Sequence, residues 1–379
     1  MYEAEKLIRL AKRENNPNRD FLLINVFQGK HYPANPSNTF KMCEALANKV
    51  KTKYPSEKFL IIGFAEAATA IAALVASFLG SYYMQTTREI IENVPALNFS
   101  EEHSHAKNQM LYIRDFAKLA KNVDRILFVE DEITTGKTLQ NACDVLDDIC
   151  HAHLNFTIAT LLDCTHDFQK NALADLGIDI ISLMHLNKED FDEKLKDFKA
   201  DGEFHNYPLS ELINLSDIEK ENLVKNVKQI EFDNAHDPRM GLNIFDLNND
   251  LEILWEHLKI PESEIKEKKV LLIGTEEFVY PSIFIGKKIS EFTNDVMCHS
   301  TTRSPMLPGN AENYPLKNRT LLPSLYDVNR ITFLYNLNKA DCVIILTDAL
   351  DQDSLGMFAL LKALKNYNNE NIYWVWWKK

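Results

Sequence analysis

Several features that would assign the chain to other protein classes are missing from its 379 residues. No dense run of lysine or arginine is present, and 55 acidic residues outnumber 42 basic ones, for a formal net charge of -13. Because affinity for a phosphate backbone needs clustered cations, nucleic acid is not expected as a partner. The six cysteines form no CxxC pair, so no metal-binding signature is indicated, and the pattern suits a reduced, cytoplasmic protein.

A signal peptide and a membrane anchor are also not expected. The first residues, MYEAEKLIRLAKRENN, are charged throughout and contain no apolar core. The stretch 60–84 is apolar and long enough to raise the question of a membrane span. Glu66 near its start and its turn residues instead favour a buried strand, a loop and a buried helix. We therefore expect no membrane partner.

What the chain does contain is an alternation of short apolar runs with helical patterns. This alternation predicts an α/β fold with a mostly parallel, Rossmann-like sheet. The stretch 209–269 is charged and helical without strand signals, and strands resume after it. We therefore predict a first domain at 1–215, and a helical connection with a second α/β domain at 216–379. Strands are expected at 21–27, 58–64, 125–131, 156–163, 179–186, 269–275, 331–337, 341–348 and 371–377, and helices at 38–51 and 137–149.

The most informative stretch is ILFVEDEITTGKTL, residues 126–139. Its TGKT is similar to the end of a Walker P-loop, but Asp131 stands where the first glycine of that motif should be. A carboxylate there would repel a triphosphate, so the P-loop interpretation fails. Instead, a buried strand ends in acidic residues, and a Thr/Gly-rich turn leads into a helix. Free amides at a helix start bind a monophosphate, and nearby carboxylates suit vicinal hydroxyls, so the pattern predicts a ribose 5-phosphate ligand.

The segment VEDEITTGKT resembles the signature of type I phosphoribosyltransferases, which binds phosphoribosyl pyrophosphate (PRPP). By that resemblance Glu130 and Asp131 would hold the ribose 2′- and 3′-hydroxyls. The usual form often has a second glycine where Lys137 stands, a change that puts a cation next to the phosphate. The resemblance also implies Mg²⁺, held mainly by PRPP oxygens, with Glu130 and Asp131 as its candidate protein ligands. The 5′-phosphate would be bound by Thr134, Thr135, Gly136, Lys137 and Thr138.

Other segments of the first half fit the same family. FAEAATA follows the strand at 58–64, where the family's pyrophosphate loop lies, and Arg88 in QTTREI is the candidate to neutralise pyrophosphate. NFSEEHSHAKNQ resembles the mobile loop that closes over the site. FQGKHYP at 27–33 either shapes the acceptor pocket or is a plain turn. The catalytic candidates are Asp131, Glu130 and Arg88, the pyrophosphate loop is Ala65, Glu66, Ala67, Ala68 and Thr69, and the flexible-loop candidates are His103, Ser104, His105 and Lys107.

The matching stretches extend over nearly the whole chain and resemble a narrower family. The matching stretches in the first half are NPNRDFLL, GKHYP, GFAEAATA, TTR, EEHSHA and VEDEITTGKT. Those in the second half are GTEEF, TTRSP and FLYNL. This family joins a transferase domain of the orotate-transferase-like branch to a C-terminal TRSP domain, named after the motif at 302–305. Its members are associated with tellurium-resistance-type stress gene clusters and are proposed to make a nucleoside-like product.

The second half contains weak repeats of the first. FLIIGFAE (59–66) resembles VLLIGTEE (270–277), TTR recurs at 86–88 and 301–303, and ILFVED (126–131) resembles VIILTD (343–348). We hypothesise that the second domain is a degenerate copy, which has lost PRPP binding because carboxylates replace the phosphate-binding turn at 351–355. Two readings of its motifs stay open, a second pocket or strand caps that hold the domains together. The residues concerned are Glu276, Glu277, Arg303 and Ser304.

Together these features predict an Mg²⁺-dependent phosphoribosyltransferase that joins PRPP to a nucleobase-like acceptor, or runs the reverse reaction. The alternative is a non-catalytic regulator that senses PRPP or nucleotides, although the Arg88 segment and the closing loop favour catalysis. A nucleoside hydrolase or phosphorylase also stays open. The acceptor hood is expected from the N-terminal residues and the chain after Asp163, and it does not specify a base. A homodimer is common in the type I family, but the second domain could take the partner's place.

Overall fold

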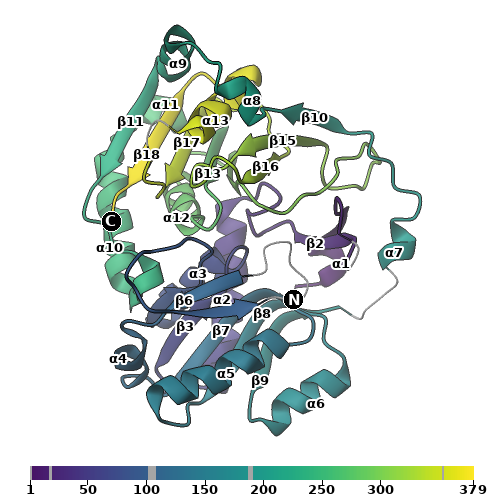
Figure 1. Ribbon diagram of the computed structural model, residues 1–379, viewed down its shortest axis with the longest axis vertical. Coiled ribbons are helices and arrows are strands. Elements are labelled where there is room, and N and C mark those ends of the chain that lie inside the picture. Colours follow the sequence, from purple (N-terminus) through teal and green to yellow (C-terminus); the bar gives the residue numbers. More distant parts are fainter. Residues whose placement is uncertain (1, 17–18, 101–107, 187–190, 352–353) are drawn as a thin grey trace. The chain divides into compact units, whose positions relative to one another are not determined.

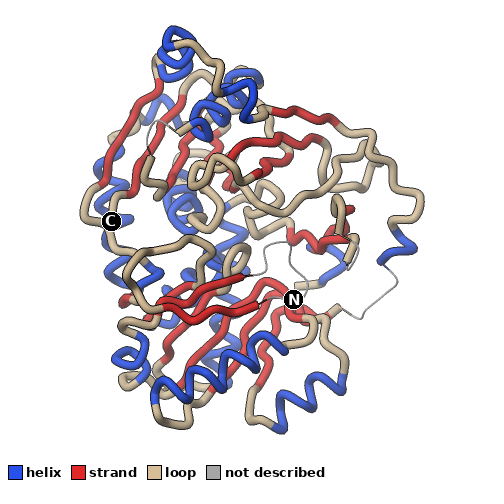
Figure 2. Tube along the Cα trace, in the orientation of Figure 1, coloured by secondary structure: helices blue, strands red, loops and turns tan. Residues whose placement is uncertain are grey.

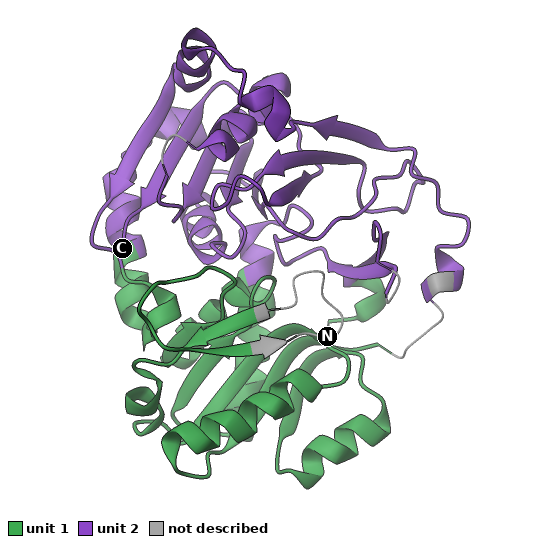
Figure 3. Ribbon diagram, in the orientation of Figure 1, with its two compact units in different colours: residues 1–6, 40–189, 236–250 green, residues 7–39, 190–235, 251–379 purple. Residues whose placement is uncertain are grey.

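The structure is a computed structural model that describes residues 2–16, 19–100, 108–186, 191–351 and 354–379. The chain forms two compact units that are interleaved in sequence (Figure 3). The division at residues 215 and 216 stays a prediction, since both units take residues from each side of it. Unit 1 comprises Met1–Lys6, Phe40–Glu189 and His236–Asp250, and unit 2 comprises Leu7–Thr39, Asp190–Ala235 and Leu251–Lys379.

Unit 1 is built on a six-stranded sheet with the order β12-β4-β3-β7-β8-β9. All neighbours are parallel except β12, which pairs antiparallel with β4 at one edge. A separate antiparallel hairpin consists of β5 and β6. The strands are β3 (Phe59–Gly63), β4 (Tyr82–Gln85), β5 (Ala96–Ser100), β6 (Asn108–Tyr112), β7 (Arg125–Ile133), β8 (Phe156–Asp163), β9 (Asp179–His185) and β12 (Leu242–Asn243). The helices lying wholly within the unit are α3 (Thr69–Leu79), α4 (Phe116–Ala120), α5 (Lys137–Cys150) and α6 (Asp167–Asp175), and η1 (Pro238–Met240) is a 3-10 turn.

Burial explains why the central segments of unit 1 become strands. Every residue of β3 and of β8 is buried, as expected for the middle of a parallel sheet covered on both faces. Helix α3 is rich in buried alanines, which allows it to approach the sheet closely. A Cβ at Gly63 would lie 2.5 Å from the Cβ of Ala72, so this strand end requires glycine. The stretch 60–84 thus forms the expected strand, loop and helix, and β4 begins at its end.

Unit 2 contains a five-stranded, all-parallel sheet with the order β11-β18-β17-β13-β14. Figure 1 labels β11, β18, β17 and β13 of this sheet. A three-stranded sheet, β10-β15-β16, and an antiparallel pair, β1-β2, complete its strands. Trp374 and Trp376 of β18 are each 1% exposed and lie in its main apolar core. The strands are β1 (Ile8–Lys12), β2 (Phe21–Asn25), β10 (Glu203–Asn206), β11 (Val227–Phe232), β13 (Val270–Gly274), β14 (Val296–Ser300), β15 (Asn318–Pro323), β16 (Ile331–Tyr335), β17 (Cys342–Thr347) and β18 (Ile372–Trp377).

The remaining helices connect these strands or cross from one unit to the other along the chain. Three of them, α1 (Ala4–Leu7), α2 (Pro36–Lys53) and α10 (Ile244–Leu258), contain residues of both units. Those in unit 2 are α7 (Phe191–Lys194), α8 (Leu209–Leu212), α9 (Asp217–Val224), α11 (Glu262–Ile265), α12 (Tyr280–Ile289) and α13 (Leu355–Asn366). Among the residues that the structure describes, no helix combines the length and the apolar character needed to cross a membrane.

Four neighbouring strands have the same order in the parallel sheets of the two units, and Figure 2 draws the strands of both units in red. The corresponding strands are β3 and β13, β4 and β14, β7 and β17, and β8 and β18. The fifth position in the sheet is β9 in unit 1 and β11 in unit 2. The equivalence extends to single hydrogen bonds. The amide of Thr86 donates to Gly63 at 2.9 Å, as that of Thr301 does to Gly274 at 3.1 Å. The expected α/β fold class is confirmed, and this agreement supports the hypothesis of a degenerate copy.

One expectation about the strands is wrong. The stretch 209–269 was expected to lack strands, but it contains β11 and β12. β11 is an edge strand with no fully buried residue, so its sequence VKQIEF keeps charges that a central strand would exclude. The predicted strand at 21–27 does form, as β2, in an antiparallel pair with β1.

Candidate active site

Strand β7 presents the acidic residues of the signature at the carboxyl end of the unit 1 sheet. Ile126–Val129 are buried, whereas Glu130, Asp131 and Glu132 are half-buried. Glu130 pairs with Thr160 of β8, so the acidic stretch still belongs to the strand. The carboxyl ends of β4, β3 and β7, which are neighbours in the sheet, open at the same edge. In open α/β sheets this edge is where ligands bind.

The Thr/Gly turn of the signature leads from β7 directly into α5. Gly136 is the N-cap residue of α5, has a φ of 72°, and provides no side-chain cap. This left-handed conformation favours glycine, and a Cβ here would also lie 2.7 Å from a methyl group of Leu173. The turn therefore presents backbone amides and threonine hydroxyls at the start of a 14-residue helix, an arrangement suited to an anion. It holds Thr134, Thr135, Gly136, Lys137 and Thr138, of which Thr135 and Lys137 are exposed.

The segment expected to bind pyrophosphate is the loop between β3 and α3. The amide of Ala65 donates to the hydroxyl of Thr86 at 2.8 Å, which ties this loop to the turn after β4. Glu66 and Thr69 are 9% and 1% exposed, and the peptide bond between Ala65 and Glu66 is cis. The small residues expected here, Ala65, Ala67 and Ala68, keep the loop close to the end of β3.

Arg88 lies half-buried in the turn after β4. Thr87, which is fully buried, holds this turn through two backbone hydrogen bonds with Met110, each 2.8 Å long. The Thr87 hydroxyl also accepts a bond from the amide of Glu89 at 3.0 Å, which closes a short turn around Arg88. The backbone of Arg88 is thus fixed on both sides.

The β5-β6 hairpin forms the base of the segment expected to close over the site. Residues 101–107, which connect its strands, lie outside the described residues, and with them the candidates His103, Ser104, His105 and Lys107. Gln109 of β6 is 1% exposed, and its side-chain oxygen accepts a bond from the Thr86 hydroxyl. The hydroxyl of Thr86 therefore joins the pyrophosphate loop to the hairpin.

Asp163 is a buried acid near the site that the sequence analysis did not propose as a ligand contact. It ends β8, pairs with Ile133 of β7, and is 4% exposed. Burial alone would raise its pKa, but hydrogen bonds from Thr165 and Lys170 outweigh burial, and the net pKa lies below its usual value. Lys170 lies 3.0 Å from the Asp163 carboxylate. Its position at the end of an apolar strand, like that of Asp131, is the signal that could have identified it.

In unit 2, three of the four candidate pocket residues form one buried ion cluster. Glu276 and Glu277 are 1% and 2% exposed. The Arg303 Nε donates to Glu276 at 2.6 Å, and a second nitrogen of Arg303 lies 3.7 Å from Glu277. Arg330 lies 3.2 Å from Glu276, which also accepts a bond from the hydroxyl of Ser324. A carboxylate of the chain itself therefore holds Arg303, the counterpart of Arg88.

The fourth candidate, Ser304, is held by a turn like that around Arg88. Its amide donates to the hydroxyl of Thr302 at 3.2 Å. Thr302 exchanges two backbone hydrogen bonds with Phe333, as Thr87 does with Met110. Ser304 therefore contributes to the turn that orients Arg303.

The counterpart of the signature in unit 2 is also engaged by the chain itself. Asp348, which aligns with Asp131, accepts a hydrogen bond from the Tyr326 hydroxyl and pairs with Lys379 at 2.6 Å. Burial and the neighbouring Asp348 raise the pKa of Tyr326, so this hydroxyl stays neutral and donates. The N-cap of α13 is Ser354, whose side chain accepts a bond from Met357 at 3.2 Å, whereas the matching cap of α5 is glycine. Gln352 and Asp353 lie outside the described residues.

His299 of β14 makes unit 2 sensitive to acid. It is 1% exposed, and burial, with a smaller effect from Lys30, lowers its pKa from 6.5 to about 4. Below pH 6.5 the unfolded chain binds a proton that the folded chain does not bind until about pH 4. We expect the free energy of unfolding to fall by about 2–3 kcal/mol between pH 7 and pH 4.5 because of this residue. Urea unfolding of wild type and His299→Gln measures it, and an equal loss in both proteins would contradict the assignment.

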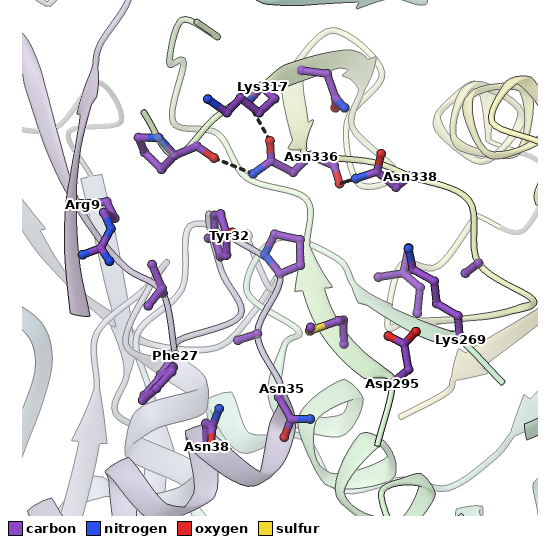
Figure 4. A pocket seen from close by; sticks show the side chains of 18 of the residues that line it. Arg9, Phe27, Tyr32, Asn35, Asn38, Lys269, Asp295, Lys317, Asn336 and Asn338 are labelled. Atoms are coloured by element: carbon purple, nitrogen blue, oxygen red, sulfur yellow. Dashed lines mark hydrogen bonds between the residues drawn. The ribbon is translucent and has the colours of Figure 1, made fainter. Parts of the chain in front are cut away.

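Unit 2 also contains a cavity of about 810 Å³ at the amino ends of its parallel strands (Figure 4). Phe27, Tyr32 and Pro33, from the segment considered for the acceptor pocket, line it together with Val270 and Asp295. Four of the asparagines that line it donate side-chain bonds to the backbone around it. The Asn336 side chain accepts a bond from the amide of Lys317 at 2.7 Å and donates to Pro315 at 2.8 Å. These amides hold the turns that line the cavity.

Family models match two regions of the chain. Residues 7–186 match the model described as phosphoribosyl transferase. Residues 237–364 match the model described as the TRSP domain C-terminal to that transferase. No curated protein matches the chain.

Solved structures with a similar fold include adenine and orotate phosphoribosyltransferases. The adenine enzyme of Trypanosoma brucei, in complex with AMP, pyrophosphate and ribose-5-phosphate, is 16% identical, with 48% of this chain and 77% of that chain covered and a TM-score of 0.35. The adenine enzyme of Thermoanaerobacter pseudethanolicus is 17% identical over 48% and 98% of the two chains, with a TM-score of 0.35. The orotate enzyme of Aeropyrum pernix is 16% identical over 51% and 94%, with a TM-score of 0.31.

The two family models account for residues on both sides of the stretch 187–236 and occur in the order that their descriptions state. The acidic pair at the end of β7, the turn at the start of α5 and the Arg88 turn all lie in the first region. The chain is therefore an enzyme of the phosphoribosyltransferase class, with a phosphoribosyl transferase region at residues 7–186 and a TRSP domain at residues 237–364.

Proposed function

We propose that the protein transfers the phosphoribosyl group of PRPP to a nitrogen of a nucleobase-like acceptor and releases pyrophosphate, or catalyses the reverse reaction. The observation that carries the proposal is the end of β7, where half-buried Glu130 and Asp131 precede a turn that opens the start of α5. This edge offers acceptors for ribose hydroxyls and donors for a 5′-phosphate within one continuous segment. The neighbouring β3 and β4 end in the loop and the turn expected to meet pyrophosphate.

The chemistry follows from the charges at this edge. As the C1–O bond to pyrophosphate breaks, the ribose becomes oxocarbenium-like, and the Glu130 and Asp131 carboxylates would stabilise its positive charge. Arg88, on its fixed turn, would stabilise the charge that develops on the leaving pyrophosphate. The acceptor nitrogen then attacks the open face of C1 and loses its proton. No covalent intermediate with the protein is needed, because positioning and electrostatics supply the catalysis.

The donor set at the end of β7 fits Mg²⁺. This ion prefers oxygen ligands and keeps several waters, and two adjacent carboxylates plus PRPP oxygens match that preference. Among the described residues, no group of three or more histidine, cysteine or acidic side chains could hold a metal by itself. Bound with PRPP, Mg²⁺ would neutralise part of the pyrophosphate charge. Glu130 and Asp131 are the residues that would contact it.

The setting of the reaction follows from the family resemblance. By that resemblance we place the reaction in a stress-linked, nucleoside-type biosynthetic pathway. All six cysteines are free, which suits a cytoplasmic protein. We expect neither nucleic acid nor a membrane as partner, and a homodimer as the oligomer to look for.

Pyrophosphate release with Mg²⁺, PRPP and a panel of purine, pyrimidine and related bases tests the proposed activity. Arg88→Ala is expected to lower kcat/KM for PRPP by about 100-fold, because it removes one stabiliser of the leaving group. Arg114→Ala is the matched control, since the Arg114 side chain is 57% exposed and pairs with its neighbour Asp115 at the surface. Tight PRPP binding with no release for any base would favour the sensing regulator.

A further inference from the structure

The segment 236–250 is separated from the rest of unit 1 by 46 residues in sequence, yet it is part of that unit. It nearly coincides with the start of the TRSP match, which begins at residue 237. Its strand β12 adds to the edge of the transferase sheet, where Leu242 and Asn243 pair with Tyr83 and Tyr82 of β4. The first residues matched by the TRSP model thus complete the transferase sheet.

Two further contacts join this segment to other parts of unit 1, and a third links its two ends. His236 is held at its beginning by Asp250, which accepts bonds of 2.8 Å from both its amide and its ring. Near its end, the side chain of Asn248 donates to Ser77 of α3 at 2.9 Å. Between these points Arg239, which is 3% exposed, reaches the turn after β4.

Arg239 makes its contact at the residue that shapes the Arg88 turn. Its Nε donates to the Thr87 hydroxyl at 3.2 Å. The same hydroxyl also accepts a bond from the amide of Glu89, so two donors hold it in place. Arg88 lies between Thr87 and Glu89 in the chain. Asp237 orients the guanidinium by accepting a bond of 3.3 Å from it. The η1 turn that contains Arg239 also packs on both β4 and the hairpin strand β6.

We propose that the η1 turn supports the transferase site and that Arg239 is a positioning residue for Arg88. This inference rests on the proposed function, in which Arg88 meets pyrophosphate. A hydrogen bond to the Thr87 hydroxyl is electrostatically stronger in a buried site than in water, and it limits how far the Arg88 turn can open. The TRSP region therefore tunes PRPP affinity through a residue that does not itself touch PRPP.

A double-mutant cycle on the full-length chain tests the proposal. Arg239→Met and Thr87→Val remove the two partners of one hydrogen bond while keeping similar shapes. Each is expected to raise the Kd and the KM for PRPP about tenfold with a smaller change in kcat, and the double variant is expected to be no worse than either single one. Thr87→Ser keeps the hydroxyl and is expected to restore wild-type affinity. Asn248→Ala, which loosens the same segment at α3, is the control and is expected to leave the Kd unchanged.

The outcomes separate this inference from the proposed function. A wild-type protein that binds no PRPP overturns both. Wild-type binding with an unchanged Kd in Arg239→Met, at an equal folded fraction by near-UV circular dichroism, overturns the inference alone. An equal loss of affinity in Asn248→Ala would also overturn it, because the effect would then follow from general loosening of the segment.

Discussion

Calorimetric titration of the full-length protein with PRPP in the presence of Mg²⁺ is expected to show micromolar binding that the Glu130→Ala/Asp131→Ala variant loses. The two carboxylates stand at the end of β7 and accept the ribose hydroxyls in the proposed complex. Removing both takes away charge-assisted hydrogen bonds of about 1.5–3 kcal/mol each, so the Kd is expected to rise by more than 100-fold. Loss of turnover is expected to be larger, on the order of 10³-fold or more, because the charge at C1 develops only in the transition state.

A matched control removes the same charge from the same part of unit 1. Asp144 and Asp148 are exposed residues of α5, which the signature turn begins. The Asp144→Ala/Asp148→Ala variant is expected to bind PRPP like the wild type. Equal losses in both double variants would mean that net charge, and not the end of β7, decides the affinity. Binding retained by the Glu130→Ala/Asp131→Ala variant would place PRPP elsewhere in the molecule.

The signature segment could be predicted from sequence because its parts are contiguous. A buried strand, an acidic end, a turn with glycine and a helix follow each other within 125–150, and each part has its own local signal. The structure adds the backbone geometry, which the sequence does not show. Gly136 is required by its φ of 72° and by the contact that a Cβ would make with Leu173.

The composition of the two units could not be predicted in the same way. Residues 7–39 belong to unit 2 and residues 236–250 to unit 1, which no local pattern indicates. β12 has only two residues, too few for a periodic signal, and β11 carries the charges of an edge strand. Arg239 and Thr87 are 152 residues apart in the sequence. Their contact depends on how the two segments pack, and the residues next to either one do not predict it.

The buried ion cluster of unit 2 could also be predicted only in part from the sequence. The sequence identifies Glu276 and Arg303 as candidates because the segments that contain them repeat those of unit 1. Their other partners, Ser324 and Arg330, lie at the turn of the β15-β16 hairpin, which was predicted only at β16. Both readings of the motif, a second pocket and strand caps that hold the domains together, start from the same residues. The hydrogen bonds favour a structural role within unit 2, since the acid and the arginine are bonded to each other.

The Glu276→Ala variant is therefore expected to show the largest loss of stability. Glu276 is 1% exposed and accepts bonds from Arg303 at 2.6 Å, from Arg330 and from Ser324. Removing it takes away the carboxylate that Arg303 and Arg330 share, and breaking such a buried ion pair costs about 3–5 kcal/mol. For a unit of this size, the melting temperature is expected to fall by roughly 10 °C. Differential scanning calorimetry measures the change.

Three further variants separate a buried ion cluster from ordinary packing. Glu291→Ala, the same change at an exposed position, is expected to leave the melting temperature within about 1 °C of wild type. Glu276→Gln keeps the shape and loses only the charge, so an intermediate loss is expected. Glu276→Ala/Arg330→Met removes one of the two guanidinium groups that lose this carboxylate and is expected to be more stable than Glu276→Ala, although it deletes more polar groups. A double variant that is less stable than the single one would show that packing by Arg330, and not its charge, holds this part of unit 2.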